Sequence, residues 1–182
     1  IMRKVGVTPH QCILVFEGMH SKKRRQAIDP TYKADREGDK PPEAYAEYSK
    51  VQVMLEKAWK GVGAIVARQP FVEGDDVIAW LARETREDLV VATFDNDLSA
   101  LNTEPGATNE HGATIVVWND GLMGVNKYGI FPYHLITTYK AIVGDPSDNI
   151  KGVKGIGDGK EAKDSGWDKL LRLIGFDGLH EL

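Results

Sequence analysis

Eight carboxylates in this chain have the type and spacing to bind divalent cations. They fall into four groups along the sequence: Glu17; Glu73, Asp75 and Asp76; Asp95 and Asp97; Asp145 and Asp148. Carboxylates gathered at one place repel each other strongly unless cations lie among them. Oxygen ligands without a neighbouring His or Cys favour Mg²⁺ or Mn²⁺. Two such ions about 4 Å apart are a common apparatus for hydrolysing a phosphodiester.

Each acidic group also has an ordinary alternative. Asp145 precedes Pro146 and could be a turn residue, while Asp148 could be a helix N-cap. The acids of 73–76 could simply favour the positive end of a helix dipole, and Asp97 could cap a short helix. All four groups follow a predicted strand or helix on the same side of the fold. This joint placement favours the metal site over separate local roles.

Residues 144–160, GDPSDNIKGVKGIGDGK, predict a hairpin that binds phosphate. The stretch matches neither the P-loop pattern nor the dinucleotide pattern. Its glycines would let the backbone approach an anion closely, and its lysines would add attraction that ignores base sequence. The residues concerned are Lys151, Gly152, Lys154, Gly155, Gly157 and Lys160. The alternative is a glycine-rich loop with solvated lysines.

A second basic segment lies at residues 21–40, with seven Lys or Arg against four Asp or Glu. It contains the run Lys22, Lys23, Arg24 and Arg25. A run of this kind is often just a solvated face, so by itself it identifies no ligand. The formal net charge of the chain is −4, and without the eight acids it would be +4. A nucleic-acid partner is therefore compatible with the composition.

The pattern of elements predicts an α/β fold with a parallel, doubly wound sheet. Short β-rich runs alternate with helical patterns: strands at 11–18, 63–68, 88–94 and 113–119, and helices at 43–61, 72–87 and 131–143. In such a sheet the carboxyl ends of the strands meet at the ligand-binding crevice. We expect residues 1–143 to form this core and residues 144–182 to form a separate module of glycine-punctuated helices.

The bulk composition limits the remaining possibilities. The chain of 182 residues is long enough for one substantial core. No apolar run approaches the roughly 18 residues that span a bilayer, and we find no signal peptide, so we expect a cytoplasmic monomer without a membrane partner. The single cysteine, Cys12, excludes an internal disulfide. We expect it to be a buried thiol.

Five motifs together resemble the bacterial and phage 5′→3′ exonuclease and flap endonuclease family, which includes the 5′ nuclease of DNA polymerase I. GDPSDNIKGVKGIG is similar to the family signature G-D-x-x-D-N-x-x-G-V-x-G-I-G. VFEG resembles F-D-G, and DPTYKADR resembles Y-P-x-Y-K-x-x-R. VEGDDVIAWLA and TFDNDLSAL resemble the acidic motifs E-A-D-D-v-I-a-t-L-A and T-G-D-x-D-l-x-q-L. The five occur in the family's order.

The resemblance implies a role for each group. The acids Glu73, Asp75, Asp76 and Asp95 would line one metal ion, and Asp97, Asp145 and Asp148 would serve a second. Lys33 and Arg36 would contact the scissile phosphate, and Tyr32 would lie near a base, where packing is an equal alternative. Residues 20–42 would form a helical arch for a single-stranded 5′ end. The hairpin would be a helix-three-turn-helix module on the duplex, with K⁺ as a possible ion.

Three departures accompany the resemblance. Glu17 stands where the family has an aspartate, the family's first strand with its acid lies upstream of Ile1, and the segment after the hairpin is more polar. We therefore predict a Mg²⁺- or Mn²⁺-dependent 5′ nuclease of DNA replication or repair, in a bacterium or a phage-infected cell. Its substrate would be DNA with a 5′ flap, nick or end. The alternatives are a DNA-binding member with impaired catalysis and a PIN-like ribonuclease.

Overall fold

The computed structural model describes residues 2, 6–34, 42–118, 133–145 and 150–154. The strands are β1 (Ile13–Val15), β2 (Ile65–Ala67), β3 (Leu89–Ala92), β4 (Ile115–Trp118), β5 (Gly144–Asp145) and β6 (Ile150–Lys151). The α-helices are α2 (Lys23–Gln26), α3 (Pro42–Gly61), α4 (Gly74–Glu84) and α5 (Ile136–Val143). Three 3-10 helices are η1 (Pro9–Gln11), η3 (Asp97–Leu101) and η4 (Tyr133–Leu135). No helix among these residues is long and apolar enough to cross a membrane.

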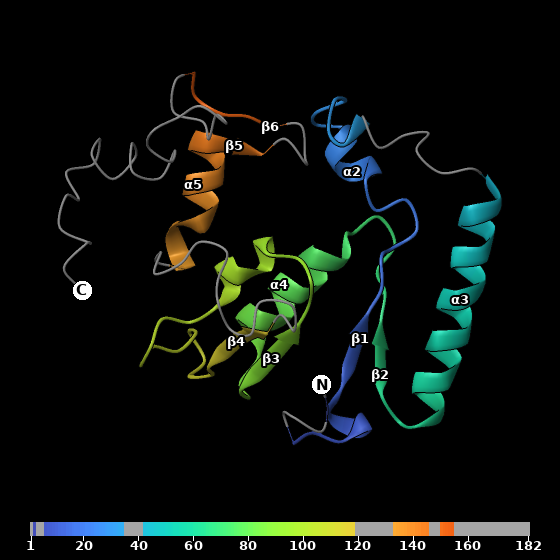
Figure 1. Cartoon of the computed structure of the whole chain (residues 1–182). Coiled ribbons are helices and arrows are strands. Elements are labelled where there is room, and N and C mark those ends of the chain that lie inside the picture. The colour runs from blue at the N-terminus through green and yellow to red at the C-terminus, as the bar shows by residue number, and fades with distance from the viewer. Residues whose placement is uncertain (1, 3–5, 35–41, 119–132, 146–149, 155–182) are drawn as a thin grey trace.

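Strands β1 to β4 pair in parallel, as the alternating pattern predicts, but the single sheet is wrong for the described part of the chain. β1 pairs with β2, with Ile13 opposite Ile65, and β3 pairs with β4, with Leu89 opposite Ile115. The two pairs are separate ladders. Helix α4 contacts β1 and also η3, and it lies in the centre of the molecule (Figure 1). The α/β architecture is therefore confirmed in the form of two parallel strand pairs around α4.

The core lies between α4 and the second strand pair. Its buried side chains are Ala82, Val91, Leu98, Ala113 and Ile115. They come from α4, β3, η3, β4 and, for Ala113, the segment just before β4, so the turn that leaves β3 is anchored on both sides. This anchoring fixes the segment that carries Asp95 and Asp97.

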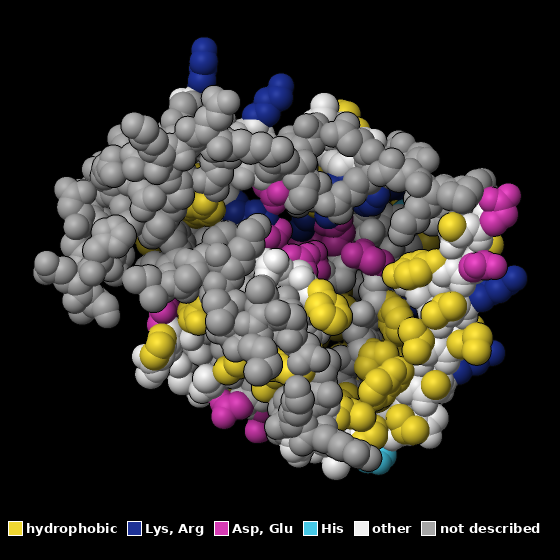
Figure 2. All heavy atoms as spheres, viewed as in Figure 1, with side chains coloured by type: hydrophobic (Ala, Val, Ile, Leu, Met, Phe, Trp, Pro, Cys, Tyr) yellow, Lys and Arg dark blue, Asp and Glu magenta, His cyan; other side chains and the backbone are white. Residues whose placement is uncertain are grey.

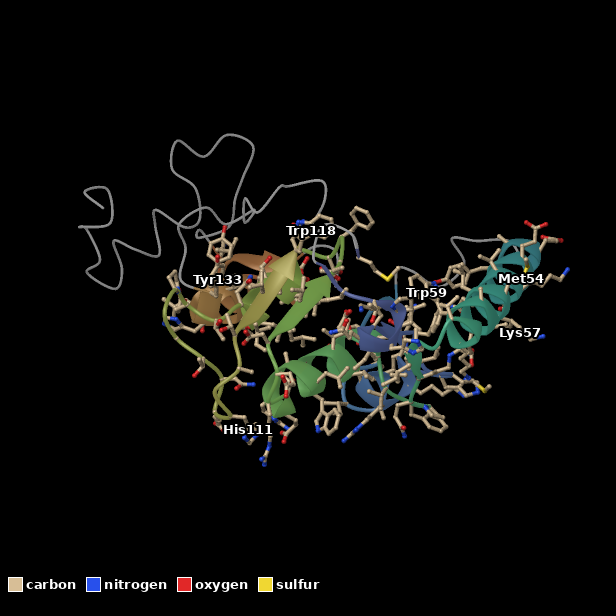
Figure 3. The ribbon with its side chains drawn as sticks, turned by 90° about the horizontal axis from the view of Figure 1, so that it is seen from below. Met54, Lys57, Trp59, His111, Trp118 and Tyr133 are labelled. Carbon is tan, nitrogen blue, oxygen red and sulfur yellow. The ribbon has the colours of Figure 1, made fainter. Side chains whose placement is uncertain are left out.

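Helix α3 forms where its periodicity predicts it, but much of its apolar stripe is exposed. Tyr48, Val51 and Leu55 keep 59%, 52% and 44% of their surface exposed. Among the described elements α3 packs mainly against β2. Met54 and Lys57 point outward, whereas Trp59 lies toward the strands and is partly buried (Figure 3). Cys12, which precedes β1, is also only partly buried, contrary to our expectation.

The described part of the hairpin differs from the predicted pair of helices. Helix α5 ends at Val143, and β5 then pairs antiparallel with β6. Gly144 has a φ of +95°, and a Cβ on Gly152 would lie 2.0 Å from the Val143 carbonyl oxygen. Gly152 is therefore needed for close contact with the protein's own backbone. The predicted residues Gly155, Gly157 and Lys160 lie outside the described residues.

Replacing Gly152 with alanine should destabilise the fold, because the added Cβ would overlap the backbone of Val143 and Gly144. Overpacking of this kind costs about 2 kcal/mol, which corresponds to a fall in Tm of about 6 °C for a chain of this size. Gly61→Ala is the matched control, since nothing lies within 4 Å of a Cβ there. Thermal unfolding should leave the control unchanged or slightly more stable. Equal Tm values for the two variants would contradict the close packing.

Candidate active site

Carboxylates from the ends of β1 and β2 lie next to each other. Glu17 follows β1, and Glu73 is the N-cap of α4, which follows β2. A Cβ on Gly74 would lie 3.7 Å from the Glu17 Oε1 atom, so Glu17 reaches the start of α4. Acidic side chains gather with Lys and Arg side chains in a hollow on this face (Figure 2). The parallel pairing of β1 with β2 brings their carboxyl ends to one edge.

The segment after β3 also lies near the start of α4, because the charge of Asp95 affects Asp75. Partial burial raises the pKa of the Asp75 carboxyl, and the negative charges of Asp95 and Glu17 raise it further. Glu73 adds to this effect, while the Lys33 ammonium opposes it. Asp95 is the third residue after β3, so three strand ends contribute charge around Asp75. These carboxylates repel one another in the fold.

Glu73 is the buried centre of the acidic group, with only 3% of its surface exposed. It accepts a hydrogen bond from the Tyr32 hydroxyl at 2.9 Å and one from Lys33 Nζ at 3.2 Å. It also forms an ion pair with Arg25 Nη1. Burial by itself would raise the pKa of Glu73, but the Tyr32 hydroxyl, Lys33 and Arg25 together lower it. Glu73 therefore stays ionised inside the protein.

Arg25 turns toward the acids, although the sequence pattern placed it on a DNA-binding surface. Its Nη2 atom lies 2.5 Å from Asp76 Oδ1, and its Nη1 atom donates to the Tyr32 hydroxyl at 2.7 Å. Arg25 belongs to the short helix α2, so the basic segment lies against the acidic group. Its neighbours Lys23 and Arg24 are exposed and Lys22 is partly buried. DNA binding by these three side chains stays a prediction.

Tyr32 and Lys33 both contact Glu73 and also contact each other. Lys33 has a φ of +51°, which is uncommon for a residue with a side chain. Its Nζ lies 5.0 Å from the centre of the Tyr32 ring, and the Arg25 guanidinium lies 5.4 Å from the same centre. Two cations therefore lie over the ring that was expected to stack on a base. Stacking by Tyr32 stays a prediction, whereas its contact with Glu73 is observed.

Lys140 links the acidic groups that contain Asp97 and Asp145. The sequence patterns did not predict this role. Its ammonium forms ion pairs with Asp97, from η3, and with Asp145, from β5. Asp145 is buried and the Lys140 side chain is 19% exposed. Burial opposes the charge on Lys140, but the two carboxylates raise its pKa well above the ordinary value. One feature of the sequence could have indicated this role: Lys140 is the single charged residue in the apolar helix ITTYKAIV.

Asp95 and Asp97 are positioned by local hydrogen bonds. The Asp95 amide donates to Thr93 Oγ1 at 3.0 Å, and the Asp97 amide donates to Asp95 Oδ1 at 2.9 Å. Asp97 is the first residue of η3, and its carboxylate goes to Lys140, so it does not cap the helix as the alternative suggested. The turn therefore holds two carboxylates pointing to different partners.

The carboxylate oxygens suit a hard divalent cation, but Arg and Lys side chains neutralise much of the negative charge of these carboxylates. Among the described residues, no three His, Cys, Asp or Glu side chains form a group that could hold a metal ion. Instead Arg25 and Lys33 neutralise Glu73 and Asp76, and Lys140 neutralises Asp97 and Asp145. Partial burial raises the pKa of Asp75, and the negative charges of Asp95 and Glu17 raise it further. Arg36 and Asp148 lie outside the described residues.

Comparison with known proteins identifies the relatives of this chain. Residues 2–124 match the family described as 5′-3′ exonuclease, N-terminal resolvase-like domain. The chain is 30% identical over 155 residues to a 5′-3′ exonuclease of Aquifex aeolicus, covering 82% of this chain and 50% of that protein. It is also 30% identical over 151 residues to the thermostable DNA polymerase I of Thermus thermophilus, covering 80% and 17% of the two chains. The chain spans half or less of the length of these curated relatives.

Solved structures support the same fold. The 5′-exonuclease of phage T5 with bound divalent metal ions (zinc) has a TM-score of 0.67 and 19% identity, over all of this chain and 66% of that chain. A phage T5 flap endonuclease in a pseudo-enzyme-product complex with DNA and metal ions has a TM-score of 0.65 and 18% identity, with the same coverage. At this identity the likeness concerns the fold.

Asp75→Asn should stabilise the metal-free protein at neutral pH, because it removes repulsion from Asp95 and Glu17. We expect a gain of about 1 kcal/mol and a rise in Tm of about 3 °C. Since the folded pKa is raised, the ionised carboxyl opposes folding at neutral pH. The gain should therefore vanish as the pH falls through the folded pKa toward the ordinary 3.8. Thermal unfolding between pH 7 and pH 3 measures this.

The matched control for that variant is Asp29→Asn. The Thr31 hydroxyl and amide lower the pKa of Asp29, so its ionised form favours the fold. The same substitution should therefore not raise the Tm at neutral pH. A rise in both variants would point to a general effect of charge rather than to repulsion at Asp75.

Lys140→Met should destabilise the metal-free protein, because Asp97 and the buried Asp145 would lose the ammonium between them. Removing one partner of a largely buried ion pair costs about 2 kcal/mol when one acid is partly exposed, or about 6 °C in Tm. Ca²⁺ should raise the Tm of this variant more than that of the wild type. Lys60→Met, on exposed α3, is the control of equal charge change. A Ca²⁺ response equal to the wild type's would contradict the pairing.

Proposed function

The chain belongs to the family of 5′-3′ exonucleases with an N-terminal resolvase-like domain, and from this membership we propose that it is a metal-dependent 5′ nuclease. The reaction is hydrolysis of phosphodiesters in DNA that carries a 5′ single-stranded flap, a nick or a free 5′ end. The observation that carries the proposal is the convergence of carboxylates from three strand ends around Asp75. A structural role alone gives no reason to place repelling charges there.

Divalent ions, Mg²⁺ or Mn²⁺, would supply an activated water and stabilise charge on the attacking and leaving oxygens. Asp75 and Asp95, with Glu73 and Asp76, would hold one ion, and Asp97 and Asp145 would serve the second. Asp148 completes the second set by the sequence resemblance. Glu17 lies close enough to Gly74 for its carboxylate to contribute to the first set. The curated relatives are named as exonucleases and polymerases, and the T5 neighbours contain metal ions, which supports this assignment.

The basic groups of this chain would bind the DNA backbone. Lys33 and Arg25 are already within contact distance of the acids, so a phosphate bound there would lie between their charges and the metal ligands. Lys151 and Lys154 are exposed at and after β6 and could attract the duplex without base readout. Binding should accordingly weaken as salt increases. A helix-hairpin-helix contact with K⁺ remains part of this proposal.

A DNA-binding protein without catalysis is the second candidate. It is favoured by the ion pairs that neutralise Glu73, Asp76, Asp97 and Asp145, since these pairs must break before metal binds. The two candidates agree on DNA binding and differ only in cleavage. A test must therefore measure binding and cleavage separately.

A labelled 5′-flap duplex tests the proposal with Mg²⁺, with Mn²⁺ and with EDTA. The wild type should release a cut 5′ product only with metal. Asp95→Asn should lower the cleavage rate by a factor of about 100 or more, because it weakens a metal ligand, while DNA binding stays equal or becomes tighter. Glu84→Gln, at the other end of α4, is the control and should cleave normally.

Three results would count against the nuclease. Binding of the flap with no product under either metal would favour the non-catalytic protein. Cleavage that persists in EDTA would remove the metal from the mechanism. Normal turnover by Asp95→Asn would place the chemistry elsewhere in the chain.

A further inference from the structure

Phe94 is an exposed aromatic side chain directly before Asp95. It keeps 80% of its surface exposed, whereas the residues on either side of the turn are held by the core. Leaving a ring of this size in water sacrifices much of its burial energy, about 1.5–3 kcal/mol. A single exposed apolar residue is ordinary on a protein surface. Phe94 differs because it occupies the turn that carries the proposed metal ligands.

The backbone around Phe94 is fixed on both sides. The Thr93 amide donates to the Trp118 carbonyl oxygen at 3.1 Å, which continues the β3–β4 ladder. On the other side the Asp95 amide donates to Thr93 Oγ1 at 3.0 Å, so the hydrogen bond spans Phe94. The ring is therefore presented by an ordered turn, and its exposure is a property of the fold.

Phe94 precedes Asp95 in the same turn, so its backbone lies next to the acidic group. Consecutive Cα atoms are about 3.8 Å apart, so the Cα atom of Phe94 lies at this distance from the Cα atom of Asp95. The charge of Asp95 in turn reaches Asp75. A nucleotide whose phosphate lies at these carboxylates would carry its base within reach of a neighbouring ring. The position itself offers a π-face to that base.

Tyr32, the aromatic residue that contacts Glu73, is engaged. Its hydroxyl donates to Glu73, and the cations of Arg25 and Lys33 lie over its ring. For Phe94, in contrast, no ring pair or cation contact is found within the part of the chain that the structure describes. Among the described residues, Phe94 is thus an exposed ring that remains available for stacking near the acids.

We infer that Phe94 stacks on a DNA base next to the phosphodiester that is cut. The inference rests on the proposed nuclease function and adds a positioning residue to it. Stacking on an aromatic side chain is worth about 1–3 kcal/mol per base and tolerates any base. It would hold the nucleotide in place without sequence readout. Such a contact suits a nuclease that recognises the shape of its substrate.

The test uses a 5′-flap duplex with 2-aminopurine placed in turn at each nucleotide flanking the junction, in Ca²⁺. Stacking quenches 2-aminopurine, so the wild type should quench the probe at one of these positions. Phe94→Ala should lose that quenching and bind the DNA about 10-fold more weakly. Phe94→Trp should keep both properties, and Phe94→Leu should lose the quenching while it keeps apolar bulk. Tyr48→Ala removes an exposed ring on α3 and should change neither.

The outcomes separate this inference from the proposed function. Wild-type protein that neither binds nor cleaves the flap would refute the proposed function itself. Wild-type cleavage together with unchanged quenching and affinity in Phe94→Ala would overturn the stacking alone. If Phe94→Ala does not fold, Phe94→Leu decides the question, because full quenching by that variant would also exclude stacking.

Discussion

Repulsion among carboxylates at the ends of parallel strands is the constraint on which the site depends. β1 and β2 run in parallel, and Glu17 and Glu73 follow them to the same edge, where Asp75 and Asp95 add further charge. Two charges 4 Å apart interact by about 4 kcal/mol at the effective dielectric constant near a protein surface. Folding therefore requires that positive charge enter the group. Arg25 and Lys33 supply such charge at Glu73.

The internal cations connect elements that share little apolar contact. Arg25 and Lys33 tie the segment after β1 to the start of α4, through the buried Glu73. Lys140 ties α5 and β5 to the turn after β3, through Asp97 and Asp145. The core cluster covers only α4, η3 and the second strand pair. Electrostatic contacts thus complete a fold whose described apolar core is small.

The role of the acids as metal ligands stays a prediction, and the sequence did not indicate which cations would pair with them. Local periodicity predicts where strands and helices occur, and the parallel pairing of β1 with β2 then puts Glu17 and the start of α4 at one edge. Asp95 follows β3, which belongs to the other strand pair, so its approach to Asp75 depends on tertiary packing. The partner of a carboxylate depends on tertiary packing, so neither Lys140 nor the inward turn of Arg25 could be predicted. The division into two strand pairs also could not be predicted, because local sequence patterns do not determine which strands lie next to each other. The contact of Gly152 with a phosphate stays a prediction, and the structure shows in addition that Gly152 lies against the backbone of Val143.

The internal ion pairs also determine how a metal could enter. A divalent ion at Asp97 and Asp145 would have to displace the ammonium of Lys140, so its net affinity is the difference between two strong interactions. The same exchange at Glu73 and Asp76 would release Arg25 and Lys33. Those freed groups would lie beside the metal ligands, where a phosphate needs positive charge. Under the proposed function, Arg25 and Lys33 would therefore be well placed to bind the substrate once metal had replaced them.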